Sequence, residues 1–206
     1  KCKIVNLEED YGPICKILGA IISEKDPETI IISIDDDVIY PDDLFEKLIQ
    51  YSEKYPAAAI GSTGIIVGNS ILSYSFVSSL TPSWNNVTGF HVPKEGRSVD
   101  LLCGVSGILY RRKFFPENTS SLVEYTKEPD LFYNDDVLIS SYLNSRNVER
   151  RLFNDIPFRQ QNPSFDENAI SASRIKFLQR FVSAVNICKT NKLLQTTVPS
   201  YITEGL

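Results

Sequence analysis

Apolar residues gather in short runs along the chain, and these runs predict strands. Residues 30–34 are rich in branched apolar side chains that do not alternate with polar ones, which is typical of a strand buried on both faces. Residues 57–61 are small and apolar and indicate a second buried strand. Further strands are expected at residues 3–7, 99–103 and 108–110. These runs together predict a central sheet.

Helical periodicity follows several of these strands. The pair Gly12-Pro13 ends an extended segment and starts a helix with Pro in its first turn. Pro41 opens a second helix, Asn134 precedes a third, and a fourth is expected around residues 175–187. In the first three helices the apolar residues are spaced as a buried face requires: Ile14, Ile17, Leu18, Ile21 and Ile22; Leu44, Phe45, Leu48 and Ile49; Val137, Leu138, Ile139, Tyr142 and Leu143.

The order of these elements predicts the fold class. Strands and helices alternate through residues 1–61, and this order is typical of an α/β fold with a mostly parallel central sheet flanked by helices. Residues 62–97 are rich in Gly, Ser, Asn and Thr and indicate hairpins and surface loops. The only Trp, Trp84, and the only His, His91, fall in this segment. We therefore expect a single α/β domain.

Composition narrows the class of protein. With 206 residues and a mass of 23.2 kDa, the chain is long enough to bury a substantial core. Its formal net charge of −5 argues against a surface that coats nucleic acid. No apolar run approaches the roughly 20 residues of a membrane span. We expect a soluble domain without a nucleic-acid partner or a membrane span, cytoplasmic if the protein is bacterial or viral.

Three carboxylates, Asp35, Asp36 and Asp37, follow directly after the first buried strand. The carboxyl end of a buried strand is where an open α/β sheet binds its ligand. Crowded like charges are most simply offset by a hard divalent cation, and Mg²⁺ or Mn²⁺ takes carboxylate, water and phosphate oxygens. The run therefore predicts a site for a metal-bound nucleotide. The alternative is a polar turn, with Asp42 or Asp43 merely capping the next helix.

Two later motifs carry similar chemistry. Residues 104–107, Gly-Val-Ser-Gly, permit a positive φ or close approach of the backbone to a ligand, although a tight connection without a ligand is the alternative. Asp135 and Asp136 begin a predicted helix, where carboxylates complement the helix dipole. Two adjacent, poorly solvated acids would also raise one pKa, as a general base working near neutral pH requires.

Together these motifs carry a family resemblance over residues 1–150. Their order resembles that of GT-A glycosyltransferases, in particular small family-2-like enzymes of bacteria and large DNA viruses. Four motifs in sequence carry the resemblance: Asp10-Tyr11-Gly12-Pro13 with Lys16; Asp35-Asp36-Asp37 with Tyr40-Pro41; Val99-Asp100 with Gly104 and Gly107; Asp135-Asp136-Val137.

The resemblance implies a GT-A fold and a nucleotide-diphospho-sugar donor, with UDP-sugar favoured. Asp35 and Asp37 would form the DxD signature that holds Mn²⁺ or Mg²⁺ on the donor diphosphate. Asp37 would be the direct ligand, and Asp35 would face the ribose or uracil. The other donor-binding residues would be Asp10, Lys16, Asp36, Gly104 and Gly107, with Lys16 on the diphosphate.

The resemblance also implies an acceptor side. Asp136 would be the catalytic base of an inverting transfer to a glycan, protein or lipid hydroxyl, and Asp135 would assist it. Residues 1–61 would form the nucleotide- and metal-binding half, and residues 62–206 the acceptor-binding half. The strand and loop that hold the nucleoside base in GT-A enzymes are expected either to be absent or to precede Lys1.

Two other classes of protein remain open. In a phosphatase of the haloacid dehalogenase type, Asp35 would be the nucleophile, Ser62 or Thr63 would follow a small apolar strand, and Asp135-Asp136 would be the metal pair. Trapping a phosphoaspartate on Asp35 would decide for it. A module that binds a glycan or nucleotide without turnover would show tight binding and no hydrolysis.

Overall fold

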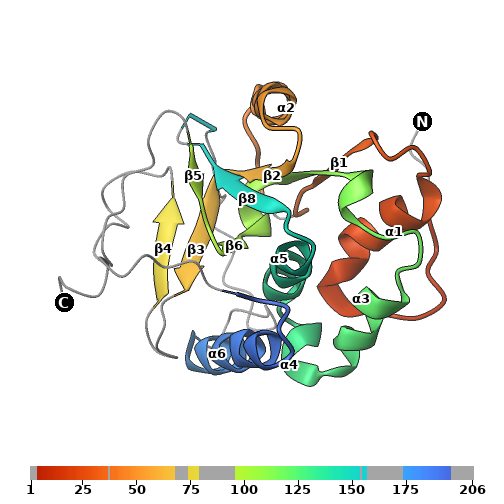
Figure 1. The fold of residues 1–206 in the computed structure, drawn as a ribbon, viewed down its shortest axis with the longest axis vertical. Helices are drawn as coiled ribbons and strands as arrows, with labels where there is room; N and C mark the ends of the chain where they lie inside the picture. The colour runs from red at the N-terminus through yellow and green to blue at the C-terminus, as the bar shows by residue number, and fades with distance from the viewer. Residues whose placement is uncertain are drawn as a thin grey trace.

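The chain forms a mixed α/β structure, drawn in Figure 1 from a computed structural model. The structure describes residues 4–36, 38–67, 74–78, 96–153, 155–156 and 174–195. The strands are β1 (Ile30–Ser33), β2 (Ala58–Gly61), β3 (Thr63–Val67), β4 (Tyr74–Ser78), β5 (Arg97–Ser98), β6 (Leu101–Leu102), β7 (Ile108–Arg111) and β8 (Glu149–Leu152).

Four helices in the described part of the chain exceed two turns. They are α1 (Cys15–Ser23), α2 (Leu44–Lys54), α5 (Asp135–Ser145) and α6 (Arg174–Thr190). The shorter turns are η1 (Gly12–Ile14), η3 (Gly104–Ser106), η4 (Arg112–Phe114), α3 (Ser120–Glu124), η5 (Tyr125–Lys127) and α4 (Pro129–Phe132). No helix within the described ranges is both long and apolar enough to cross a membrane.

The main sheet has five strands in the order β1-β7-β2-β8-β5. Only β2 and β8 pair in parallel, whereas β7 is antiparallel to both β1 and β2, and β5 is antiparallel to β8. The prediction of a mostly parallel sheet is therefore wrong, and the sheet is mixed. The alternation of strands and helices implied parallel neighbours, but the later strand β7 inserts between β1 and β2. A second, antiparallel sheet has the order β4-β3-β6.

The inserted strand determines what meets at one edge of the sheet. Because β1 and β2 are both antiparallel to β7, they run in the same direction, and β8 runs with them. Ile108, the first residue of β7, lies opposite Ser33 of β1 and Gly61 of β2. The residues just after β1 and just before β7 are thus brought to the same edge.

Helix α1 confirms most of its predicted buried face. Ile14, Ile17, Leu18 and Ile21 are at most 1% exposed, whereas Ile22, in the last turn, is 43% exposed. The Gly-Pro pair does begin the helical segment, as predicted, with η1 leading into α1. Residues 4–7 form no strand, so that part of the predicted strand at 3–7 is wrong, and Lys3 lies outside the described residues.

Helix α2 buries a narrower stripe than predicted. Leu44 and Leu48 are fully buried, but Phe45 and Ile49 are 50% and 36% exposed, which contradicts their prediction as inner residues. Of the described helices longer than two turns, Figure 1 shows only α2 on one face of the main sheet, while α1, α5 and α6 lie on the other side. A helix without lateral helical neighbours buries only the side chains that point directly at the sheet.

Two hydrophobic clusters fill the two faces of the sheet. The larger one joins α1, α5 and α6 to the sheet and includes Ile31 of β1, and the smaller one lies under α2, with Ile32 of β1 packed against it. Strand β1 therefore contacts both clusters, as its apolar composition predicted, although Ile34 beyond its end is 44% exposed. The predicted face of α5 is confirmed, because its five apolar residues are all buried.

A buried guanidinium ties α5 and β8 to the segment before β6. Arg150 is 8% exposed; its Nε donates to the carbonyl oxygen of Asp100 at 3.2 Å and its Nη1 to that of Val148 at 2.7 Å. Nη2 donates to Asn144 Oδ1 of α5 at 2.8 Å. Asp100 in turn accepts a hydrogen bond from the backbone N–H of Val67 at 2.7 Å. Asp100 thus has a structural role in this network.

We expect Arg150→Met to lower the free energy of unfolding by about 2–4 kcal/mol, because it leaves buried acceptors without their charged donor. Urea denaturation measures the change. Arg146, an exposed residue at the end of α5, gives the matched control, and Arg146→Met should change stability by less than about 0.5 kcal/mol. Equal effects of the two substitutions would contradict the structural role of Arg150.

Candidate active site

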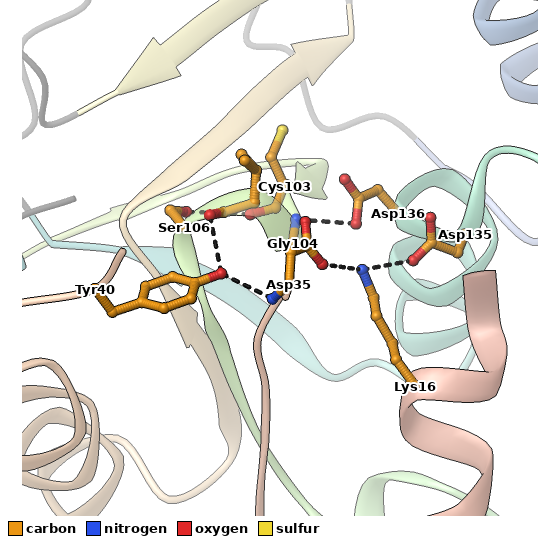
Figure 2. A network of polar contacts seen from close by, with 9 residues as sticks. Lys16, Asp35, Tyr40, Cys103, Gly104, Ser106, Asp135 and Asp136 are labelled. Carbon is orange, nitrogen blue, oxygen red and sulfur yellow. Dashed lines mark hydrogen bonds and ion pairs between the residues drawn. The ribbon is translucent and has the colours of Figure 1, made fainter. Parts of the chain in front are cut away.

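Lys16 joins two of the predicted motifs. Its side chain leaves α1 beside the buried face, and Nζ lies 3.1 Å from Asp35 Oδ1 and 2.9 Å from Asp135 Oδ2 (Figure 2). The side chains of Lys16, Asp35 and Asp135 are 22%, 28% and 13% exposed, so the ion pairs are partly shielded from water. The ammonium therefore links the loop after β1 to the first turn of α5. We call residues 34–36 the acidic loop.

Asp136 contacts the predicted glycine motif. Its Oδ1 accepts a hydrogen bond from the backbone N–H of Gly104 at 2.9 Å, and the residue is partly buried. We call residues 104–107 the glycine turn. It consists of η3 and Gly107, and the Ser106 hydroxyl donates to the carbonyl oxygen of Cys103 at 3.1 Å. The glycine turn is thus fixed to α5 by a carboxylate and closed by its own serine.

Glycine suits both ends of this turn for different reasons. A Cβ on Gly104 would lie 2.8 Å from Lys16 Nζ and 2.9 Å from Asp136 Oδ1, closer than real Cβ atoms come to such groups. Gly107 has a φ of +81°, a backbone conformation that favours glycine. The positive φ predicted for this segment is confirmed at Gly107, while the close approach of its backbone to a ligand stays a prediction. The group that approaches Gly104 is the lysine–aspartate pair of the protein itself.

The surroundings of Asp136 change the pKa of its carboxyl group. Burial, followed by the charge of Asp135, raises the pKa of Asp136 to about 7. The positive charge of Lys16 and the hydrogen bond from Gly104 act in the opposite direction but are weaker. Burial would lower the pKa of Lys16, but the charges of Asp135 and Asp136 outweigh it, so the pKa is raised and the ammonium stays charged. Asp136 can therefore exchange a proton near neutral pH.

Tyr40 is a member of the site that the sequence analysis named only as part of a motif. Its hydroxyl accepts a hydrogen bond from the backbone N–H of Asp35 at 2.8 Å and donates one to the carbonyl oxygen of Val105 at 3.2 Å. Figure 2 shows the ring on the side of Asp35 away from Lys16. In the sequence, Tyr40 was marked only by its place in the motif Asp35-Asp36-Asp37 with Tyr40-Pro41.

The remaining predicted site residues lie in different surroundings. Asp10 is exposed, and its Oδ1 accepts a hydrogen bond from the backbone N–H of Gly12 at 2.8 Å, so it shapes the turn before α1. Asp36 is exposed next to Asp35. Asp37, the predicted direct metal ligand, lies outside the described residues, as do Trp84 and His91. The structure therefore brings together Lys16, Asp35, Gly104, Asp135 and Asp136.

A divalent metal ion at this edge would need oxygen ligands. Among the residues that the structure describes, no group of three His, Cys, Asp or Glu side chains could hold such an ion. Mg²⁺, however, is often bound by only one or two protein carboxylates, with water and substrate phosphates completing its shell. Asp35 is partly exposed and fits such a shared site. Asp37 remains its predicted partner.

Comparison with known proteins gives no family assignment. No protein-family model matches the chain, and no curated protein matches its sequence. The function is therefore argued from the motifs and from the distances between their side chains.

The raised pKa of Asp136 makes the stability of the fold depend on pH. The unfolded carboxyl titrates near pH 3.9, so between about pH 4 and 7 the folded state holds a proton that the unfolded chain has lost. Stability from this group is present below about pH 4 and is lost as the pH rises to about 7. In the presence of a chelator, the parent should lose about 2–3 kcal/mol more than Asp136→Asn between pH 5 and pH 8, measured by urea denaturation. If the parent loses no more stability than Asp136→Asn over this pH range, the raised pKa of Asp136 is contradicted.

Proposed function

We propose that the chain is a metal-dependent glycosyltransferase that moves a sugar from a nucleotide-diphosphate donor, UDP-sugar first among them, to an acceptor hydroxyl with inversion. The observation that carries the proposal is the meeting of Lys16, Asp35, Gly104 and the Asp135-Asp136 pair at one edge of the sheet. These residues come from four separated motifs whose order resembles that of GT-A enzymes. A GT-A fold, with a donor half and an acceptor half, is part of this proposal.

Asp136 is the catalytic base in this proposal. One of its oxygens is held by the N–H of Gly104, and the residue as a whole is only partly buried. The carboxylate takes the proton of the acceptor hydroxyl while the oxygen of that hydroxyl attacks the anomeric carbon. The bond between this carbon and the diphosphate oxygen breaks, and the electron pair leaves with the diphosphate. A pKa near neutral suits a base of this kind.

In this proposal Lys16 supplies a positive charge for the donor diphosphate. It is bound to Asp35 and Asp135 in the structure, so a donor diphosphate would share or replace one of these carboxylates on the ammonium. Its raised pKa keeps it cationic over the whole range in which Asp136 titrates. Lys16 can therefore bind a phosphate oxygen and still offset part of the negative charge of the neighbouring acids.

The metal would be held on the donor side of the site. Asp35 and Asp37 would be its protein ligands, with Asp36 exposed beside them. When bound, the cation offsets the negative charge of the diphosphate as it leaves. Asp135, bound to Lys16, would keep the ammonium in place and would affect turnover less than Asp136.

We expect Asp136→Asn to leave the affinity for UDP and Mn²⁺ nearly unchanged while lowering turnover by roughly 10²- to 10⁴-fold, the usual contribution of a positioned base. An amide keeps the size of the side chain but does not accept a proton. Donor hydrolysis or transfer is assayed across a panel of nucleotide sugars, with the product anomer determined by NMR. Full activity of the variant, or retained configuration in the product, would remove Asp136 from the base role.

Metal binding is tested separately from turnover. We expect Asp35→Asn and Asp37→Asn each to weaken binding of Mn²⁺ with UDP by at least about tenfold, because each removes a ligand charge and keeps the side-chain size. Asp42, exposed in the same connection, gives the control variant Asp42→Asn, which should bind like the parent. Calorimetric titration measures all three. Parent-like binding in both ligand variants would show that the metal site is elsewhere.

The structure weakens the phosphatase alternative. That mechanism needs a hydroxyl of Ser62 or Thr63 at the substrate, but these side chains are only 0% and 2% exposed. A binding module without turnover remains the second candidate, and it predicts UDP-sugar binding without hydrolysis in the parent protein.

A further inference from the structure

The hydroxyl of Tyr40 makes two hydrogen bonds at once, one to each loop of the candidate site. It accepts from the backbone N–H of Asp35 in the acidic loop at 2.8 Å, and it donates to the carbonyl oxygen of Val105 in the glycine turn at 3.2 Å (Figure 2). A hydroxyl can fill both roles because it carries one donor and two acceptor positions. No purely apolar ring could join the two backbones in this way.

The glycine turn is held from its other side by Asp136. The N–H of Gly104 binds the Asp136 carboxylate, and the next residue, Val105, offers its carbonyl to Tyr40. The two contacts therefore lie on consecutive residues of η3. The chain of hydrogen bonds runs from the acidic loop through Tyr40 and the glycine turn to the proposed base.

The ring of Tyr40 is held by packing contacts that do not involve its hydroxyl. It is partly buried and packs against the smaller hydrophobic cluster, which includes Leu44 of α2. This packing fixes the ring on the α2 side of the sheet, while the hydroxyl reaches the edge where the acidic loop and the glycine turn meet. The ring and the hydroxyl thus have different functions.

We propose that Tyr40 is a positioning residue that clamps the acidic loop to the glycine turn and so sets the separation between Asp35 and Asp136. The importance of that separation rests on the proposed function, in which the donor binds at the acidic loop and the acceptor proton goes to Asp136. The segment between the clamped residues Asp35 and Tyr40 also contains Asp36 and Asp37 in sequence.

Tyr40→Phe tests the clamp, because it keeps the ring and removes only the hydroxyl. The matched control is Tyr51→Phe: Tyr51 also packs its ring, stacked on Phe153 with centroids 3.6 Å apart, and also hydrogen-bonds an aspartate, at 2.5 Å to Asp155 Oδ1. Amide hydrogen exchange followed by mass spectrometry reports on both loops in the metal-free protein.

In Tyr40→Phe, peptides covering the acidic loop and the glycine turn should each exchange roughly tenfold faster than in the parent, since each loop loses a hydrogen bond. Exchange in β2 should match the parent, which would show that the fold is intact. Tyr51→Phe should leave both loops at the parent rate. Unchanged exchange in either loop of Tyr40→Phe, or faster exchange throughout the protein, would overturn the clamp.

Titration with Mn²⁺ alone gives a readout that a merely structural role would not change. Tyr40→Phe should bind Mn²⁺ roughly tenfold more weakly than the parent, and Tyr51→Phe should bind it equally well. Parent-like Mn²⁺ affinity in Tyr40→Phe would overturn its role in positioning the acidic loop. If the parent itself binds no Mn²⁺, the metal site of the proposed function is wrong, and the exchange experiment alone decides the clamp.

Discussion

The ion pairs of Lys16 are the interaction on which the candidate site depends. Asp35, Asp135 and Asp136 would repel one another at one edge of the sheet if no cation lay among them. The ammonium lies within 3.1 Å of the first and 2.9 Å of the second, which allows acids from two distant segments to remain close together. Because these groups are partly buried, removing one leaves its partner poorly compensated, so lysine and acids depend on each other.

The strand order of the mixed sheet places the backbone of the glycine turn against this charged cluster. Strand β7 runs antiparallel between β1 and β2, so the glycine turn before it reaches the same edge as the acidic loop after β1. Gly104 can then donate its N–H to Asp136, and the absence of a Cβ leaves room for Lys16. A wholly parallel arrangement of these strands would have brought the end of β7, instead of its beginning, to this edge.

The charged groups are carried by elements that are well anchored in the core. Lys16 is followed on α1 by the fully buried Ile17 and Leu18, and Asp136 is followed on α5 by the buried Val137 and Leu138. A site on such helices is held more precisely than one on loops alone. The acidic loop is not itself helical, and Asp35 is held there by Lys16 of α1 and by the Tyr40 hydroxyl.

The sequence by itself determined most of the local elements. Helical periodicity predicted the buried faces of α1 and α5, and short apolar runs predicted the strands β1, β2 and β7, because buried segments concentrate apolar residues. It also marked Lys16, Asp35, Gly104 and Asp136 as candidates by residue type. Only the tertiary structure decided that β7 lies between β1 and β2 and that Lys16 pairs with both Asp35 and Asp135. Strand order and long-range ion pairs depend on contacts between distant segments, which leave no period in the sequence.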